Sequence, residues 1–175
     1  MVKPGQIVEI PSSSPIFEDD HSTFSSKLDE LNVNLQKKNY GLFDGFLVGE
    51  QQGTHHFKLG QRKGINVGGK KAPLYVIGIN EETNQLFVGQ GEDHPGLWIR
   101  VISFNKNQID HLNSIEEGNP VNLKSEAVEE DFTGKFYHHN ETVIVELEKP
   151  MPISVYNHPI EIITDIQTIS SINLI

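Results

Sequence analysis

The sequence predicts a mainly β protein with one or two helices. From residue 45 onward, short segments rich in β-branched and aromatic residues recur at spacings of about 8–15 residues, which is typical of a small antiparallel β-barrel. Only one stretch shows the periodicity of an amphipathic helix. Twelve of the 15 glycines lie between residues 41 and 100, and this density indicates tight turns or close backbone approach in that part of the chain.

The helix is predicted within residues 22–40, after a loop over residues 11–21. Four apolar residues recur there at helical spacing: Phe24, Leu28, Leu31 and Leu35. Ser26, with Asp29 three residues later, fits a capping box at the start, and Gly41 fits the end. A helix with such a stripe is expected to pack across a sheet and to serve stability.

The strands are predicted in nine segments, and residues 80–84 are a polar hairpin loop between two of them. The segments are residues 46–48, 74–79, 85–88, 98–104, 120–123, 132–137, 142–147, 160–164 and 169–174. The first three lie in the glycine-rich part of the chain, and the other six account for the predicted barrel.

Charge is distributed unevenly along the chain. The 175 residues contain 14 Lys and Arg against 24 Asp and Glu, a net charge of −10, so the surface as a whole repels phosphate. Residues 51–80, however, hold five cations and no acid, whereas residues 101–175 hold four lysines and twelve acids. Contact with nucleic acid would therefore have to come from the basic segment.

The absence of cysteine excludes disulfides, thiolate zinc sites, iron–sulfur clusters and a cysteine nucleophile, and it favours a reducing compartment. No apolar run approaches the roughly 18 residues of a membrane span, and the first residues are polar and turn-like. We therefore expect a soluble, cytoplasmic protein without a membrane partner.

Three kinds of active site are disfavoured. Residues 64–71 nearly match a phosphate-binding loop, but Lys71 stands where a hydroxyl would bind Mg²⁺, and a strand follows where a helix is needed. The pairs His55-His56 and His138-His139 lack metal-site spacing, so no metal is expected. No Gly-x-Ser-x-Gly nucleophile motif exists, and we expect no catalytic residue in this chain.

The basic segment is the remaining candidate site. Its five cations could hold a phosphodiester backbone, and the neighbouring glycines would allow close approach of the protein backbone. The cations are Lys58, Arg62, Lys63, Lys70 and Lys71. His56, Phe57 and Tyr75 could stack against bases nearby. An ordinary solvated surface is the alternative reading of the same five cations.

Residues 53–69, which contain Gly-Gln-Arg-Lys-Gly, and residues 88–97, which contain Gly-Gln-Gly-Glu-Asp-His-Pro, resemble the signature of the tRNA-specific 2-thiouridylases, formerly named tRNA methyltransferases. Residues 4–8 and 44–50 resemble the start of the same domain. The motif residues are Gly60, Gly64, Gly68, Gly69, Gly89, Gln90, Gly91, Asp93, His94 and Pro95. Two long motifs in register make this resemblance specific.

The resemblance implies a domain of the family's central, α+β type over residues 1–97, with a helical insertion at about 22–40, followed by a divergent, elongation-factor-like β-barrel over residues 98–175. The family's ATP-pyrophosphatase domain, with its catalytic cysteines, ATP and Mg²⁺, has no counterpart here. We therefore expect no cofactor in this chain, tRNA as a weakly bound partner, and a separate catalytic chain.

The barrel departs from the family pattern. Acidic residues replace arginine over residues 123–130, His158 stands where the family has a glutamine near the tRNA, and the family's terminal glycines are lost. The resemblance still adds Gln61 and His158 to the candidate RNA-binding residues. Two functions remain open: an accessory part of a wobble-uridine 2-thiolation enzyme that positions tRNA, or a scaffold module that kept the fold and lost the RNA.

Overall fold

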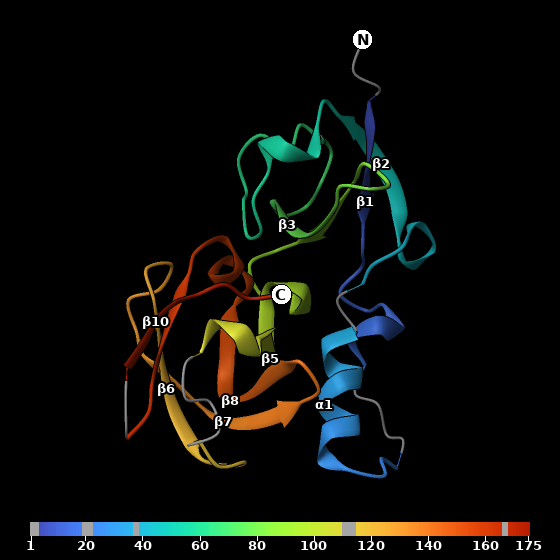
Figure 1. Ribbon diagram of the computed structural model, residues 1–175. Coiled ribbons are helices and arrows are strands. Elements are labelled where there is room, and N and C mark those ends of the chain that lie inside the picture. Colours follow the sequence, from blue (N-terminus) through green and yellow to red (C-terminus); the bar gives the residue numbers. More distant parts are fainter. Residues whose placement is uncertain (1–3, 19–22, 37–38, 110–114, 166–167) are drawn as a thin grey trace. The chain divides into compact units, whose positions relative to one another are not determined.

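The computed structural model describes residues 4–18, 23–36, 39–109, 115–165 and 168–175 (Figure 1). The chain divides into two compact units. Unit 1 comprises residues 1–21 and 37–98, and unit 2 comprises residues 22–36 and 99–175. The chain thus leaves unit 1, contributes a helix to unit 2, returns, and leaves again. The domain boundary near residue 97 that the resemblance suggests stays a prediction.

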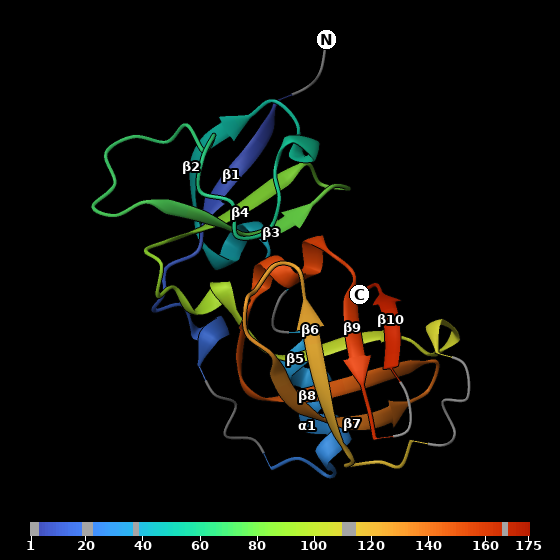
Figure 2. The same ribbon diagram turned by 90° about the vertical axis from the view of Figure 1, so that its left-hand side faces the viewer.

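Unit 1 is built on a four-stranded sheet in the order β2-β1-β4-β3, drawn with labels in Figure 2. The strands are β1 (Gly5–Glu9), β2 (Phe46–Gln51), β3 (Leu74–Asn80) and β4 (Gln85–Gln90). Strand β1 runs antiparallel to β2 and parallel to β4, and β3 and β4 form the predicted hairpin. The sequence did not predict β1, which nevertheless lies inside the sheet.

One face of this sheet carries an apolar cluster. Its buried members are Ile7, Leu74, Val76, Leu86 and Val88. The side chains packed against them come largely from the long connection between β2 and β3. Because burial of apolar area is the main stabilising term, this packing holds the connection against the sheet.

Unit 2 contains a six-stranded sheet in the order β10-β9-β6-β7-β8-β5. The strands are β5 (Trp98–Asn105), β6 (Pro120–Ser125), β7 (Phe132–His139), β8 (Thr142–Pro152), β9 (Ile160–Ile163) and β10 (Thr168–Ile172). All six predicted segments are confirmed as strands. The mainly β class is confirmed too, but the barrel is not closed: among the described residues, the ladder ends at β5 on one side and at β10 on the other. Beyond β10, the Ile175 N–H donates to the Ser103 carbonyl at 2.9 Å.

Helix α1 (Lys27–Gln36) packs in unit 2. Leu31 is fully buried against Val101 of β5 and Ile144 of β8, and Leu28 and Leu35 flank it. Three of the four residues of the predicted apolar stripe are therefore confirmed, whereas Phe24 precedes the helix. We expected the helix as an insertion of the first domain, but it belongs to unit 2. Short 3-10 helices complete the fold: η1 (Pro15–Phe17), η2 (Leu42–Asp44), η3 (Thr54–His56), η4 (Pro95–Leu97), η5 (Lys106–Gln108) and η7 (Ile153–Asn157).

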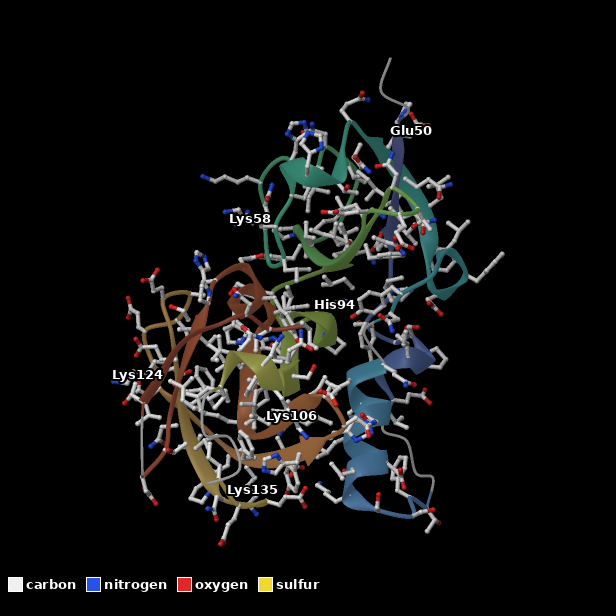
Figure 3. All side chains as sticks on the ribbon, viewed as in Figure 1. Glu50, Lys58, His94, Lys106, Lys124 and Lys135 are labelled. Atoms are coloured by element: carbon white, nitrogen blue, oxygen red, sulfur yellow. The ribbon has the colours of Figure 1, made fainter. Side chains whose placement is uncertain are left out.

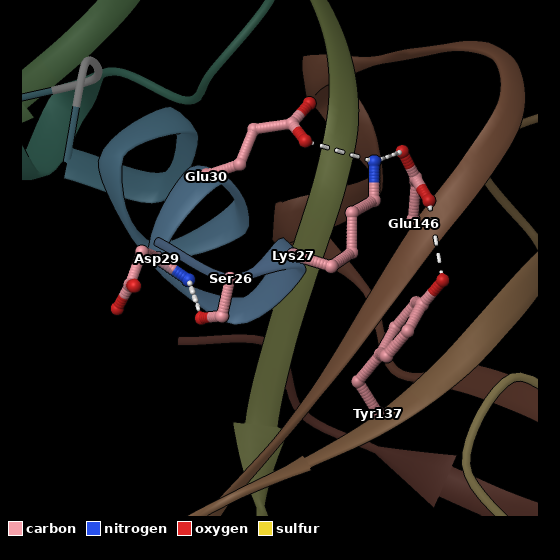
Figure 4. Close-up of polar contacts among 6 residues, drawn as sticks. All are labelled: Ser26, Lys27, Asp29, Glu30, Tyr137 and Glu146. Atoms are coloured by element: carbon pink, nitrogen blue, oxygen red, sulfur yellow. Dashed lines mark hydrogen bonds and ion pairs between the residues drawn. The ribbon is translucent and has the colours of Figure 1, made fainter. Parts of the chain in front are cut away.

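Polar contacts fix the first turn of α1 (Figure 4). The Ser26 hydroxyl accepts a hydrogen bond from the Asp29 N–H at 3.2 Å, as the capping pattern predicted. Lys27 Nζ lies 2.6 Å from Glu146 Oε1 on β8, and this contact raises the pKa of Lys27. The ion pair joins the first turn of the helix to β8 at the surface, whereas Leu31 is the buried residue of the helix.

Among the described residues, we find no helix of the length and apolar character needed to cross a membrane.

Candidate nucleic-acid interface

The candidate interface is the basic loop, which we define as residues 57–71 of unit 1. Four of its apolar side chains pack against the core cluster of the sheet: Phe57, Leu59, Ile65 and Val67. Between these anchors, Lys58, Arg62 and Lys63 are exposed, and Figure 3 shows Lys58 projecting from this unit. The alternation of apolar and basic residues therefore presents cations on a loop that is held to a rigid sheet.

The backbone of the basic loop requires glycine at three positions. Gly60, Gly64 and Gly69 have φ values of 80°, 86° and 75°, in the left-handed region that side chains with a Cβ rarely adopt. The loop is also tied to the edge of the sheet, because the Gly60 N–H donates to the Val76 carbonyl and the Val76 N–H to the Gln61 carbonyl, at 2.8 and 2.9 Å. These glycines of the motif thus have a structural role.

The side chain of Gln61 forms hydrogen bonds with the backbone of two cationic residues, Lys58 and Lys63. Its side-chain oxygen accepts from the Lys58 N–H at 2.9 Å, and its side-chain nitrogen donates to the Lys63 carbonyl at 2.8 Å. The resemblance made Gln61 a candidate for RNA contact, but both polar atoms of its side-chain amide form hydrogen bonds with the backbone of the loop. These two hydrogen bonds fix the backbone at Lys58 and Lys63.

Three of the candidate cations line one open depression of about 410 Å³: Arg62, Lys70 and Lys71. Ile65, Val67 and the segment 72–74 form the rest of its wall, and Gly69 leaves one side without a side chain. Lys58 and Lys63 are not part of this lining. A site with several cations and no wall of carboxylates suits a phosphate group, which accepts hydrogen bonds from both guanidinium and ammonium groups.

Lys70 differs from the other cations because it has an internal partner. Its ammonium forms a close ion pair with the carboxylate of Glu9, the last residue of β1. The two side chains are only 25% and 16% exposed, so the pair is more sheltered than a surface ion pair. Sequence reasoning missed Glu9, since nothing local relates residues 61 positions apart.

The second motif, residues 88–97, is explained by the packing of His94. The ring is 2% exposed and bonded at both nitrogens, with Nε2 2.9 Å from the Ile10 carbonyl and Nδ1 accepting from the Gly96 N–H at 3.1 Å. A backbone N–H can only donate, so Nδ1 is unprotonated and Nε2 carries the hydrogen. Gly89 lies directly against the ring, leaving no room for a Cβ.

The rest of this motif shapes the turn around His94. Gly91 has a φ of 93°, and Pro95 occupies the first position of η4, where its missing N–H costs nothing. Asp93 is exposed, and Gln90 is half-buried at the end of β4. The motif therefore builds the fold of unit 1 and presents Asp93, an acid, at the surface.

Burial makes His94 a source of pH-dependent stability. Desolvation lowers its pKa, partly opposed by the bond to Ile10 and the charge of Glu9. The unfolded chain then binds more protons than the native one below the ordinary histidine pKa of about 6.5, so the free energy of unfolding should fall as pH drops. We expect a lower urea midpoint at about pH 5.5 than at about pH 7.5, and a weaker pH dependence in His94→Gln. Equal pH dependence in both proteins would contradict this assignment.

The other candidates are not among the residues that line the depression. Phe57 is packed into the core cluster, so its ring is not a free stacking surface. The exposed rings of His55 and His56 lie 4.0 Å apart in η3, a 3-10 turn. His158 is exposed but belongs to unit 2, beyond η7. Within the part of the chain that the structure describes, no cluster of His, Asp and Glu could hold a metal ion.

Comparison with known proteins finds a family model that matches the segment containing the basic loop, and it finds relatives that match part of the chain. Residues 34–90 match the family model for the tRNA methyl transferase PRC-barrel domain. The chain is 45% identical over 96 residues to the tRNA-specific 2-thiouridylase MnmA of Christiangramia forsetii. The 96 residues cover 55% of this chain and 24% of that relative. It is 37% identical over 107 residues to the tRNA-specific 2-thiouridylase MnmA of Flavobacterium johnsoniae. These 107 residues cover 61% of this chain and 27% of that relative.

A third relative, the tRNA-specific 2-thiouridylase MnmA of Karelsulcia muelleri, is 40% identical over 111 residues, which cover 63% of this chain and 27% of the relative. The chain spans about a quarter of the length of the curated relatives it matches. The methyltransferase label is the older name for the same family. The resemblance expected from the sequence is therefore confirmed: over the segment that holds the basic loop, this chain is similar to the tRNA-specific 2-thiouridylases.

Proposed function

We propose that this chain is an RNA-contacting part of a tRNA wobble-uridine 2-thiolation system, not catalytic alone, that positions tRNA and docks on a separate catalytic chain. The observation that carries the proposal is the basic loop, whose cations are fixed on the sheet of unit 1 within the segment similar to the 2-thiouridylases. ATP, Mg²⁺ and the sulfur chemistry would belong to the catalytic chain. A thiolation assay of that chain with and without this protein tests the docking role.

The geometry supports recognition of backbone phosphate more than recognition of bases. Arg62 can bind two phosphate oxygens with its planar guanidinium, and Lys71 adds a second charge on the same depression. Lys58 and Lys63 are exposed on the same loop and add two further positive charges to it. Such contacts fix the register of an RNA without reading its sequence.

A scaffold function is the alternative, and specific observations favour it. The motif side chains of Gln61 and His94 are used within the fold, and Lys70 is paired with Glu9. Residues 101–175 carry a net charge of −8, which repels RNA. On this reading the motifs persist because unit 1 needs them to fold.

Binding of an unmodified tRNA transcript separates the two functions. Arg62→Ala with Lys63→Ala should weaken binding roughly tenfold at low salt and reduce the slope of log affinity against log salt by about 1.5, because two phosphate contacts are lost. Lys106→Ala with Lys135→Ala, which removes two cations from unit 2, is the charge-matched control and should change binding little. Equal effects of the two double variants, or no effect of the first, would leave the scaffold function.

A further inference from the structure

Glu9 is a sheltered carboxylate at the end of β1 that pairs with a cation of the basic loop. Its backbone lies in register with Phe46 of β2 on one side and with Val88 of β4 on the other. Its carboxylate is largely buried and reaches Lys70 across 61 residues of sequence. The strand therefore fixes the backbone from which this carboxylate reaches Lys70.

Lys70 faces both this carboxylate and the depression. It lines the depression with Arg62 and Lys71, while its ammonium is bonded to Glu9. Phosphate and carboxylate oxygens accept the same ammonium hydrogens, so a phosphate that enters the depression competes with Glu9 for Lys70. The carboxylate also repels the incoming phosphate, and this effect acts at short range where the side chains are sheltered from water.

We infer that Glu9 is a positioning residue that sets the strength of anion binding by the basic loop: it occupies Lys70 and leaves Arg62 and Lys71 for the ligand. The inference rests on the proposed function, since the anion is the RNA phosphate. Glu9 also faces His94, whose pKa its charge raises, but the buried ring stays neutral at neutral pH.

The test compares Glu9→Gln with Glu50→Gln in binding of an unmodified tRNA transcript at several salt concentrations. Glu50 is exposed on β2 of the same unit and controls for the loss of one negative charge (Figure 3). Freeing Lys70 should tighten binding by about threefold at low salt and steepen the salt slope by about 0.7–0.9, the contribution of one phosphate contact. Equal changes in the two variants would overturn the inference, because net charge alone would then explain them.

The double variant Glu9→Gln with Lys70→Met supplies a second test. Lys70→Met alone would leave the Glu9 carboxylate unpaired and repelling phosphate, so both members of the ion pair are changed together. Because the double variant has no ammonium to free, it should bind about as tightly as the wild type, and the gain from Glu9→Gln should disappear. A gain that persists in the double variant would overturn the inference, because it could not come from Lys70.

The outcomes also separate this inference from the proposed function. If Arg62→Ala with Lys63→Ala weakens binding but Glu9→Gln does not tighten it, the RNA site stands and the role of Glu9 fails. If the wild-type protein shows no salt-dependent binding of the transcript, both fail together.

Discussion

Gly89→Ala should lower the free energy of unfolding by about 3 kcal/mol, as measured by urea denaturation. A Cβ at this position would lie 2.5 Å from the Cγ and Nδ1 atoms of His94. The ring cannot move aside without losing its bonds to Ile10 and Gly96, and the backbone of Gly89 is held in the sheet opposite Tyr75 of β3. Overpacking and the loss of buried hydrogen bonds therefore act together.

Gly68→Ala is the matched control, because a Cβ at Gly68 meets no atom within 4 Å. It should change the free energy of unfolding by less than about 0.5 kcal/mol. Similar losses in the two variants would show that the tight contact between Gly89 and His94 does not exist in solution. The pair therefore tests directly whether the second motif serves the fold.

Leu31→Ala should lower the free energy of unfolding by about 2–5 kcal/mol. Leu31 is fully buried, and its removal leaves a cavity between α1 and the strands that carry Val101 and Ile144. Hydrogen exchange should quicken in β5, β7 and β8, which belong to unit 2, and should stay unchanged in β1 and β4 of unit 1. Leu35→Ala, at a half-buried position of the same stripe, should cost clearly less.

Faster exchange in β1 and β4 but not in β8 would contradict the assignment of α1 to unit 2. A loss of stability no larger than that of Leu35→Ala would contradict the central position of Leu31. The hydrogen-exchange result would return the helix to the first domain, where the sequence placed it.

The difference between the predicted and observed position of α1 has a physical reason. The spacing of Leu28, Leu31 and Leu35 indicates which face of the helix is buried, so the buried face was predictable. It does not state which apolar surface covers that face, because many surfaces satisfy the same pattern. The partners, Val101 and Ile144, lie far along the chain, and only the fold brings them to the helix.

Strand β1 was missed for a local reason. It has only five residues, begins at a glycine and is followed closely by the proline-rich segment 11–15, so turn signals outweigh its two β-branched residues. Its position between β2 and β4 depends on pairing across the sheet, which a single segment does not reveal. The nine other strands were longer or lay between clearer turn signals.

The candidate site was predictable in composition but not in arrangement. The cations of the basic loop were evident from the sequence, and Arg62, Lys70 and Lys71 do line one depression. The internal uses of Gln61 and His94 and the pairing of Lys70 with Glu9 were not evident, because each depends on a contact that the folded chain creates. These contacts decide which motif residues remain available to a ligand.

The most direct test of the RNA interface is a titration of the isotope-labelled wild-type protein with an unmodified tRNA transcript, followed by NMR. The amide signals of the basic loop, residues 57–71, should shift most, and the changes should diminish as salt is raised. Signals of unit 2, including those near His158, should change little. Shifts spread evenly over both units, or no shift in the basic loop, would contradict the assignment of this loop as the RNA contact.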